Sequence, residues 1–160
     1  MKIFGHPVHV MLIHFPSALF PMDLACSFLA VYTGNSSFND SAFYAASIGV
    51  MAGWLALITG AIDLLGVAKH KPRSLNKALL HGTINSTVLI GYTLLVFLSY
   101  KHYPELGNDS ALTVSIKTTL ILLLFLGNYF GGSLILKDGV GLEENRDRQP
   151  KKKRQQEMKN

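Results

Sequence analysis

The first apolar segment opens with Gly5-His6-Pro7-Val8-His9, which leads through residues 10–13 into His14-Phe15-Pro16. Three histidines and two prolines therefore open an apolar run that continues to about Tyr32. A run of this length can span a bilayer, which needs about 20 apolar residues. Because imidazole is costly to place in lipid, we expect these histidines to face protein, water or a bound group.

The composition is that of a membrane domain. Hydrophobic residues make up 49% of the 160 residues and charged residues only 16%, whereas soluble domains carry about 25% charged residues. The formal net charge of +5 comes from one loop and the C-terminal tail, so it indicates orientation in the membrane and no nucleic-acid partner. The single cysteine, Cys26, has no partner for a disulfide or a cysteine-based metal site, and we expect it to be a buried packing residue.

Four apolar segments predict the fold. Each is long enough to cross a bilayer as a helix, which satisfies its backbone polar groups internally. The short polar connectors make consecutive helices antiparallel neighbours. We therefore predict an all-α, integral membrane, up-down four-helix bundle in residues 1–142, followed by a polar, basic tail at residues 143–160. The predicted spans are about residues 8–32, 43–67, 78–100 and 111–136.

Basic residues predict which ends of the bundle face the cytoplasm. The loop between the second and third spans carries four basic residues and no acidic one, and the tail carries the run at residues 151–154. With an even number of spans, the N-terminus, this loop and the tail share one side. The positive-inside rule therefore predicts cytoplasmic N- and C-termini. The four basic loop residues are Lys69, Lys71, Arg73 and Lys77.

Small residues recur four positions apart within two of the spans. Gly49 and Gly53 form one such pair in the second span, and Gly127 and Gly131 form another in the fourth. Pairs of this kind let neighbouring helices, or a flat cofactor, approach the helix backbone closely.

Polar residues gather at one predicted depth. In an antiparallel bundle, His14 on the first span and His81 on the third lie at the same level near the cytoplasmic side, and Asp63 and Asn85 lie close by. Two imidazoles on alternate helices suit axial ligation of haem iron. We therefore predict a non-covalent haem b with His14 and His81 as ligands, since no Cys-x-x-Cys-His motif occurs. Asp63 and Asn85 would orient the imidazoles, and the basic loop would neutralise the haem propionates.

Three alternatives stay open. His6 and His9, together with His14, Asp63 and His81, offer ligands for non-haem iron, copper or zinc. The histidines could instead form structural hydrogen bonds in a cofactor-free assembly subunit. Asp23 and Asp63 could pass protons. Lys117, near the outer end of the fourth span, is expected to snorkel to the interface. Motifs typical of soluble nucleotide-binding proteins, serine hydrolases and zinc peptidases are absent.

Several motifs resemble a family of bacterial membrane proteins, domain of unknown function 2231. The opening Gly5-His6-Pro7-Val8-His9 with His14-Phe15-Pro16 is similar to the family's Gly-His-Pro-x-His-Pro…His-Phe-Pro start, with Val10 where the family often has proline. The resemblance covers about residues 5–142. It continues through Gly60-Ala61-Ile62-Asp63, His81 with Asn85, Gly131-Gly132-Ser133-Leu134 and Gly139-Val140-Gly141.

The resemblance implies four helices in the bacterial cytoplasmic membrane, and functional roles for His14, Asp63 and His81, with His9 as a further cofactor-binding candidate. Family members can accompany Rieske-type or other redox proteins, and they look similar to b-type cytochromes. The leading hypothesis is therefore an electron-transfer or accessory subunit rather than a stand-alone enzyme. Its expected partners are the lipid bilayer, a quinol or Rieske-type protein, and other membrane redox subunits or a second copy of the chain.

Overall fold

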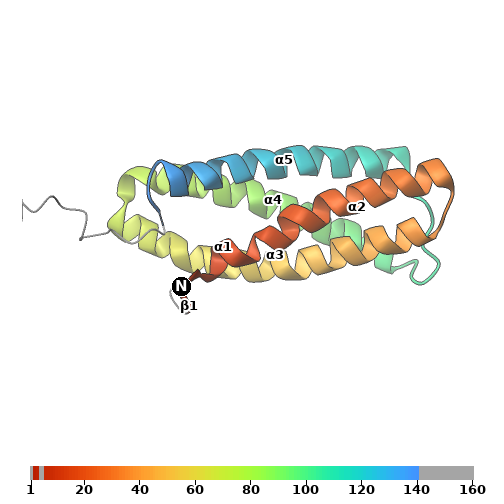
Figure 1. The fold of residues 1–160 in the computed structure, drawn as a ribbon, viewed down its shortest axis with the longest axis horizontal. Coiled ribbons are helices and arrows are strands. Elements are labelled where there is room, and N and C mark those ends of the chain that lie inside the picture. Colours follow the sequence, from red (N-terminus) through yellow and green to blue (C-terminus); the bar gives the residue numbers. More distant parts are fainter. Residues whose placement is uncertain (1, 4–5, 141–160) are drawn as a thin grey trace, which may run out of the picture.

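The computed structural model describes residues 2–3 and 6–140, and its long helices run antiparallel to one another (Figure 1). The predicted all-α, up-down four-helix bundle is confirmed, while the predicted tail at residues 143–160 lies outside the described residues. Two short strands pair antiparallel before the first helix, with Lys2 opposite Pro7. The elements are β1 (Lys2–Ile3), β2 (His6–Pro7), α1 (Val8–Leu12), α2 (His14–Thr33), α3 (Ser37–His70), the 3-10 helix η1 (Pro72–Ser74), α4 (Leu75–Tyr100) and α5 (Ala111–Leu136).

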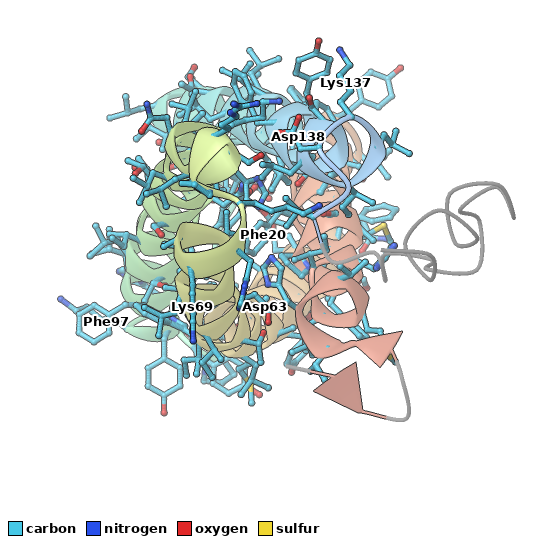
Figure 2. The ribbon with its side chains drawn as sticks, turned by 90° about the vertical axis from the view of Figure 1, so that its left-hand side faces the viewer. Phe20, Asp63, Lys69, Phe97, Lys137 and Asp138 are labelled. Atoms are coloured by element: carbon cyan, nitrogen blue, oxygen red, sulfur yellow. The ribbon has the colours of Figure 1, made fainter. Side chains whose placement is uncertain are left out.

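The outer surface of the bundle is apolar. Met51, Leu65 and Leu122 are 71%, 72% and 64% exposed, and Phe97 projects outward from α4 (Figure 2). Such a surface is unfavourable in water and suits contact with lipid tails. The chain is therefore a multi-pass membrane protein. Four helical segments are long and apolar enough to span a membrane, namely Val8–Thr33, Ser37–His70, Pro72–Tyr100 and Ala111–Leu136.

The helices extend beyond two of the predicted apolar segments. α3 already begins at Ser37, because its hydrogen-bonded backbone continues past the apolar residues, and Asp40 in its first turn complements the helix dipole. α4 likewise begins at Leu75, directly after η1. α5 starts at Ala111, where the Ser110 side chain accepts a hydrogen bond of 3.1 Å from the Thr113 backbone N–H. Apolar composition thus locates the membrane part of a helix better than its ends.

The first span is interrupted at Ile13, between α1 and α2. Pro16 consequently lies in the first turn of α2, where a missing backbone N–H costs little. Pro21 lies inside α2, a position that membrane helices tolerate. The short helix α1 packs against α3. Ile13 itself keeps right-handed helical dihedral angles, and the hydrogen bonds from Ile13 N–H to the His9 oxygen and from Ser17 N–H to the Ile13 oxygen continue the helical pattern across it. α1 and α2 therefore form one span.

A central aromatic pair fills the middle of the bundle. Phe20 on α2 and Tyr92 on α4 are almost fully buried and stack with ring centres 3.8 Å apart (Figure 2 shows Phe20). Gly49 on α3 makes room for this pair, because an added Cβ would meet the Phe20 ring at 2.7 Å. The Gly49 and Gly53 pair therefore serves helix packing. Val88, Leu89, Leu120, Ile121 and Leu124 complete the same core cluster.

Candidate cofactor-binding site

His9 is held against α3 by one hydrogen bond and one close contact. Its Nδ1 lies 2.8 Å from the backbone oxygen of Ala56. Its ring rests on Gly60, where an added Cβ would lie only 2.7 Å from His9 Cε1. Because a carbonyl oxygen only accepts hydrogen bonds, Nδ1 carries a proton, and in the neutral imidazole Nε2 is then the nitrogen with the lone pair.

His81 on α4 is held against α5 in the same way. Its Nδ1 lies 2.8 Å from the backbone oxygen of Gly127. Its ring rests on Gly131, where an added Cβ would lie 2.7 Å from His81 Cε1. The Gly127 and Gly131 pair therefore provides a carbonyl and a flat seat for an imidazole. Again Nδ1 carries a proton, so in the neutral imidazole Nε2 is the nitrogen with the lone pair.

The two rings lie beside each other in the bundle. Their centres are 6.4 Å apart and their planes are inclined by 81°. Within the described residues, neither Nε2 atom has a hydrogen-bond partner. Two imidazoles that bind one metal ion from opposite sides, each at about 2 Å, have ring centres about 6 Å apart. The spacing of His9 and His81 therefore matches that of a pair of axial ligands.

Two cavities meet at these histidines. The first, cavity A, has a volume of about 290 Å³ and extends between α3 and α4 towards Gly82 and Ser86. The second, cavity B, has a volume of about 690 Å³ and extends towards His14 on α2 and Gly132 on α5. Cofactor sites commonly have volumes of about 300–1,000 Å³. Both cavities are lined by His9, Ile13, Ser17, Asp63, Val67, His81, Asn128, Leu134 and Val140.

Other predicted site residues also lie at this level. Asp63 on α3 lines both cavities. Asn85 lies one turn beyond His81, and its Nδ2 donates a hydrogen bond of 2.9 Å to the His81 backbone oxygen. The same Nδ2 lies 3.1 Å from His81 Nδ1, but that nitrogen already donates to Gly127, so the contact is not a second hydrogen bond. Asn128 on α5 donates to the Ser17 hydroxyl at 3.1 Å.

The structure brings His9, rather than His14, against His81. His14 is exposed and lines cavity B, and its Nδ1 lies 3.4 Å from the Met11 backbone oxygen. His14 lies five positions after His9, which on a helix turns their side chains about 140° apart. The two rings therefore point in different directions. The structure places His9 next to the predicted ligand His81, while His14 reaches only cavity B.

The spacing of buried residues along the first span indicates which of its histidines faces the bundle interior. The buried residues of α2 include Pro16, Phe20 and Asp23, which are spaced three or four positions apart. The same interval leads back through Ile13 to His9, and both residues line cavity A. His14 does not fit this spacing. This periodicity is the signal that could have identified His9 from the sequence.

The basic loop residues are partly engaged by the end of α5. Lys71 Nζ donates to the backbone oxygens of Asp138 and Gly139 at 2.8 and 2.7 Å. Lys77 Nζ forms an ion pair of 2.7 Å with the Asp138 carboxylate, and this hydrogen bond holds the pKa of Asp138 below its usual value. Lys71 also lines cavity B, beside His70. These contacts tie the C-terminal end of α5 over the end of the bundle that contains the cavities.

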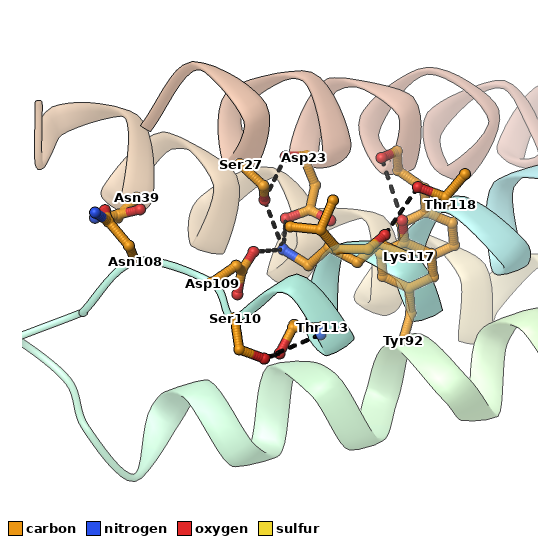
Figure 3. A network of polar contacts seen from close by, with 12 residues as sticks. Asp23, Ser27, Asn39, Tyr92, Asn108, Asp109, Ser110, Thr113, Lys117 and Thr118 are labelled. Atoms are coloured by element: carbon orange, nitrogen blue, oxygen red, sulfur yellow. Dashed lines mark hydrogen bonds and ion pairs between the residues drawn. The ribbon is translucent and has the colours of Figure 1, made fainter. Parts of the chain in front are cut away.

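Lys117 departs from the prediction that it would snorkel to the membrane interface. It is only 7% exposed, and it points into the bundle, where it forms an ion pair with Asp23 (Figure 3). The acidic and hydroxyl side chains around it supply the ammonium group with hydrogen-bond acceptors inside the bundle. The sequence signal was the presence of one acidic and one basic residue in the outer halves of two spans. Cys26 is buried, as predicted.

The chain matches one family model, but no individual curated protein or solved structure. No curated protein and no solved structure shows significant similarity to the chain. A family model with the description "Predicted membrane protein (DUF2231)" matches residues 5–144. Since that match covers most of the 160 residues, the chain belongs to this family of membrane proteins.

Proposed function

We propose that this protein binds a haem b between His9 and His81 and carries electrons within the membrane. The observation that carries the proposal is the imidazole pair. The two rings come from different helices, their centres are 6.4 Å apart, and each Nδ1 is fixed by a backbone carbonyl. When bound, haem iron supplies reversible one-electron chemistry.

The donor set fits haem better than a non-haem metal. Among residues 2–3 and 6–140, no three His, Cys, Asp or Glu side chains are close enough together to hold a metal ion. A protein site for non-haem iron, copper or zinc usually supplies three or four ligands. A porphyrin brings four nitrogens of its own and needs only two axial ligands from the protein. Two isolated imidazoles are therefore the expected protein contribution to a haem site.

The residues around the pair have separate tasks in this proposal. His9 and His81 present Nε2 towards the bound group, while Ala56 and Gly127 fix the orientation of the rings through Nδ1. Gly60 and Gly131 leave space under the imidazoles. The apolar part of the cavity lining, which includes Val67 and Leu134, would limit the contact of a bound group with water. A lower local dielectric and fewer water molecules help to set a haem potential.

The partners follow from the surroundings of the site. Cavity A extends between the exposed faces of α3 and α4, so a lipid-soluble quinol or a membrane redox subunit could approach the site from the bilayer. The positive-inside rule assigns this end of the bundle to the cytoplasmic side of a bacterial inner membrane. We therefore propose a quinol or a membrane redox subunit as the direct electron donor or acceptor.

The test is the absorption spectrum and iron content of the full-length protein, purified in detergent from cells supplied with a haem precursor. Wild type should show a Soret band and one haem per chain. His9→Ala and His81→Ala should each lose most of the haem, because each removes an axial ligand. His102→Ala is the control, since His102 is an exposed histidine in the connector before α5, and it should keep the haem. A wild-type protein without a Soret band and without iron refutes the proposal.

A cofactor-free structural subunit is the second candidate function. It is favoured by the fact that both histidines already link helices, His9 to α3 and His81 to α5. In that case the His9→Ala and His81→Ala variants would lose thermal stability or assembly with a partner, while no preparation would contain haem. Measuring haem content and thermal unfolding on the same samples separates the two functions.

A further inference from the structure

A second polar cluster lies beyond the Phe20 and Tyr92 pair, at the opposite end of the bundle from the histidines. Its centre is Lys117 on α5. Lys117 Nζ contacts Asp23 Oδ1 and Asp109 Oδ2, both at 2.7 Å, and Ser27 Oγ at 2.8 Å (Figure 3). The three ionisable residues come from α2, from α5 and from the connector before α5. This cluster takes no part in the proposed haem site.

The charges of this cluster do not balance. One ammonium group faces two carboxyl groups, so the cluster would carry one net negative charge if all three groups were ionised. The Asp23 side chain is fully buried, and the Lys117 side chain is 8% exposed. An uncompensated charge is very costly in such surroundings, and groups respond by binding or releasing a proton.

Asp23 also has an oxygen that the surrounding protein leaves unsatisfied. Oδ2 of Asp23 is buried and has no hydrogen-bond partner among residues 2–3 and 6–140. Asp23, Tyr92, Asp109 and Lys117 line a small cavity of about 30 Å³, which is enough for a water molecule. A buried carboxyl oxygen next to such a cavity is a site where a proton can be bound and exchanged through water.

We propose that Asp23, Lys117 and Asp109 form a proton-binding site that holds one proton at neutral pH. The proton lies on the Asp23 carboxyl, which leaves the Lys117 ammonium and the Asp109 carboxylate as a neutral ion pair. Asp109 is 20% exposed, and it connects the cluster to the aqueous phase at the connector end of the bundle. The proton is taken from water through the small cavity and returns by the same route.

Tyr92 on α4 and Cys26 on α2 are titratable groups beside Asp23, and neither supplies a positive charge that would balance a second carboxylate. The Tyr92 hydroxyl on α4 donates to the Phe20 backbone oxygen at 3.3 Å. The α3 residues that line the cavity, Asn39, Ala42, Phe43 and Ala46, contain no titratable group. Cys26, three residues after Asp23 on α2, is buried.

Infrared spectroscopy of the full-length protein in lipid nanodiscs tests this site, with ¹³C-labelled aspartate to assign the carboxyl bands. At neutral pH, wild type should show the C=O stretching band of a protonated aspartate, and this band should shift when H₂O is replaced by D₂O. Asp23→Asn and Asp109→Asn should both lose this band, because each variant leaves one ammonium and one carboxylate in balance. Asp40→Asn, at an exposed position in the first turn of α3, should keep it.

Each outcome decides the proposal. Absence of the band in wild type, or its persistence in either Asp23→Asn or Asp109→Asn, overturns the proton-binding site. Circular dichroism at the same pH verifies that the variants are folded. If Asp23→Asn does not fold, Asp109→Asn provides the same comparison, because it removes the more exposed carboxylate and leaves the buried pair intact. None of these measurements depends on haem binding.

Discussion

The contact between His81 and Gly131 allows a specific prediction, because the neighbouring Gly132 has no atom within 4 Å of an added Cβ. An added Cβ at Gly131 would lie 2.7 Å from His81 Cε1, whereas nothing lies within 4 Å of the corresponding position at Gly132. Gly131→Ala should therefore displace the imidazole, and Gly132→Ala should not. Both residues lie within α5, so the two variants share the same helical background.

The size of the effect follows from the geometry. Ordinary contacts of a Cβ begin at 3.4 Å, so the ring must move by about 0.7 Å from its present 2.7 Å. A shift of that size along the 2.8 Å bond to Gly127 would stretch it to about 3.5 Å and break it. The lost hydrogen bond costs about 1 kcal/mol and overpacking costs about 1–3 kcal/mol.

Replacing a helical glycine with alanine also returns about 1 kcal/mol of helix propensity. The net destabilisation of Gly131→Ala is then about 1–3 kcal/mol, while Gly132→Ala should be stabilised by about 1 kcal/mol. Equilibrium unfolding in mixed detergent micelles measures both free energies of unfolding. Haem content of the same samples should fall only in Gly131→Ala. Equal stabilities and equal haem contents for the two variants would refute the assignment of Gly131 as the seat of His81.

Two further predictions concern charged residues. Lys117→Met should lower the free energy of unfolding by about 3–5 kcal/mol, because it removes the largely buried cation that contacts both Asp23 and Asp109, whereas Lys137→Met at an exposed position should change it little. The Lys77 contact lowers the pKa of Asp138, so its stabilisation is present above the unfolded-state value of about 3.9 and is lost as the pH falls through the folded-state value. The difference in thermal midpoint between wild type and Asp138→Asn should therefore be constant near pH 7 and shrink below about pH 4; a difference that grows in acid contradicts this.

The number and order of the membrane-spanning helices can be predicted from the sequence alone. Hydropathy is a local property that adds along a segment, so four apolar runs separated by short polar connectors were enough to predict four antiparallel spans. The same positions on successive antiparallel helices also placed His81, Asn85 and Asp63 at one level. The motifs of the first span and of residues 60–63 likewise indicated the family that the family model identifies.

The pairs of side chains that are in contact, in contrast, are known only from the tertiary structure. The rotation of each helix about its axis turns His9 towards His81 and leaves His14 exposed. The same rotations bury Lys117 against Asp23. Such pairings depend on which face of a helix packs against which neighbour, and that is set by the combined packing of all four helices. Helices that are hydrophobic on every side carry little information about that rotation, so the depth of these residues can be predicted from the sequence, whereas their partners depend on how the bundle packs.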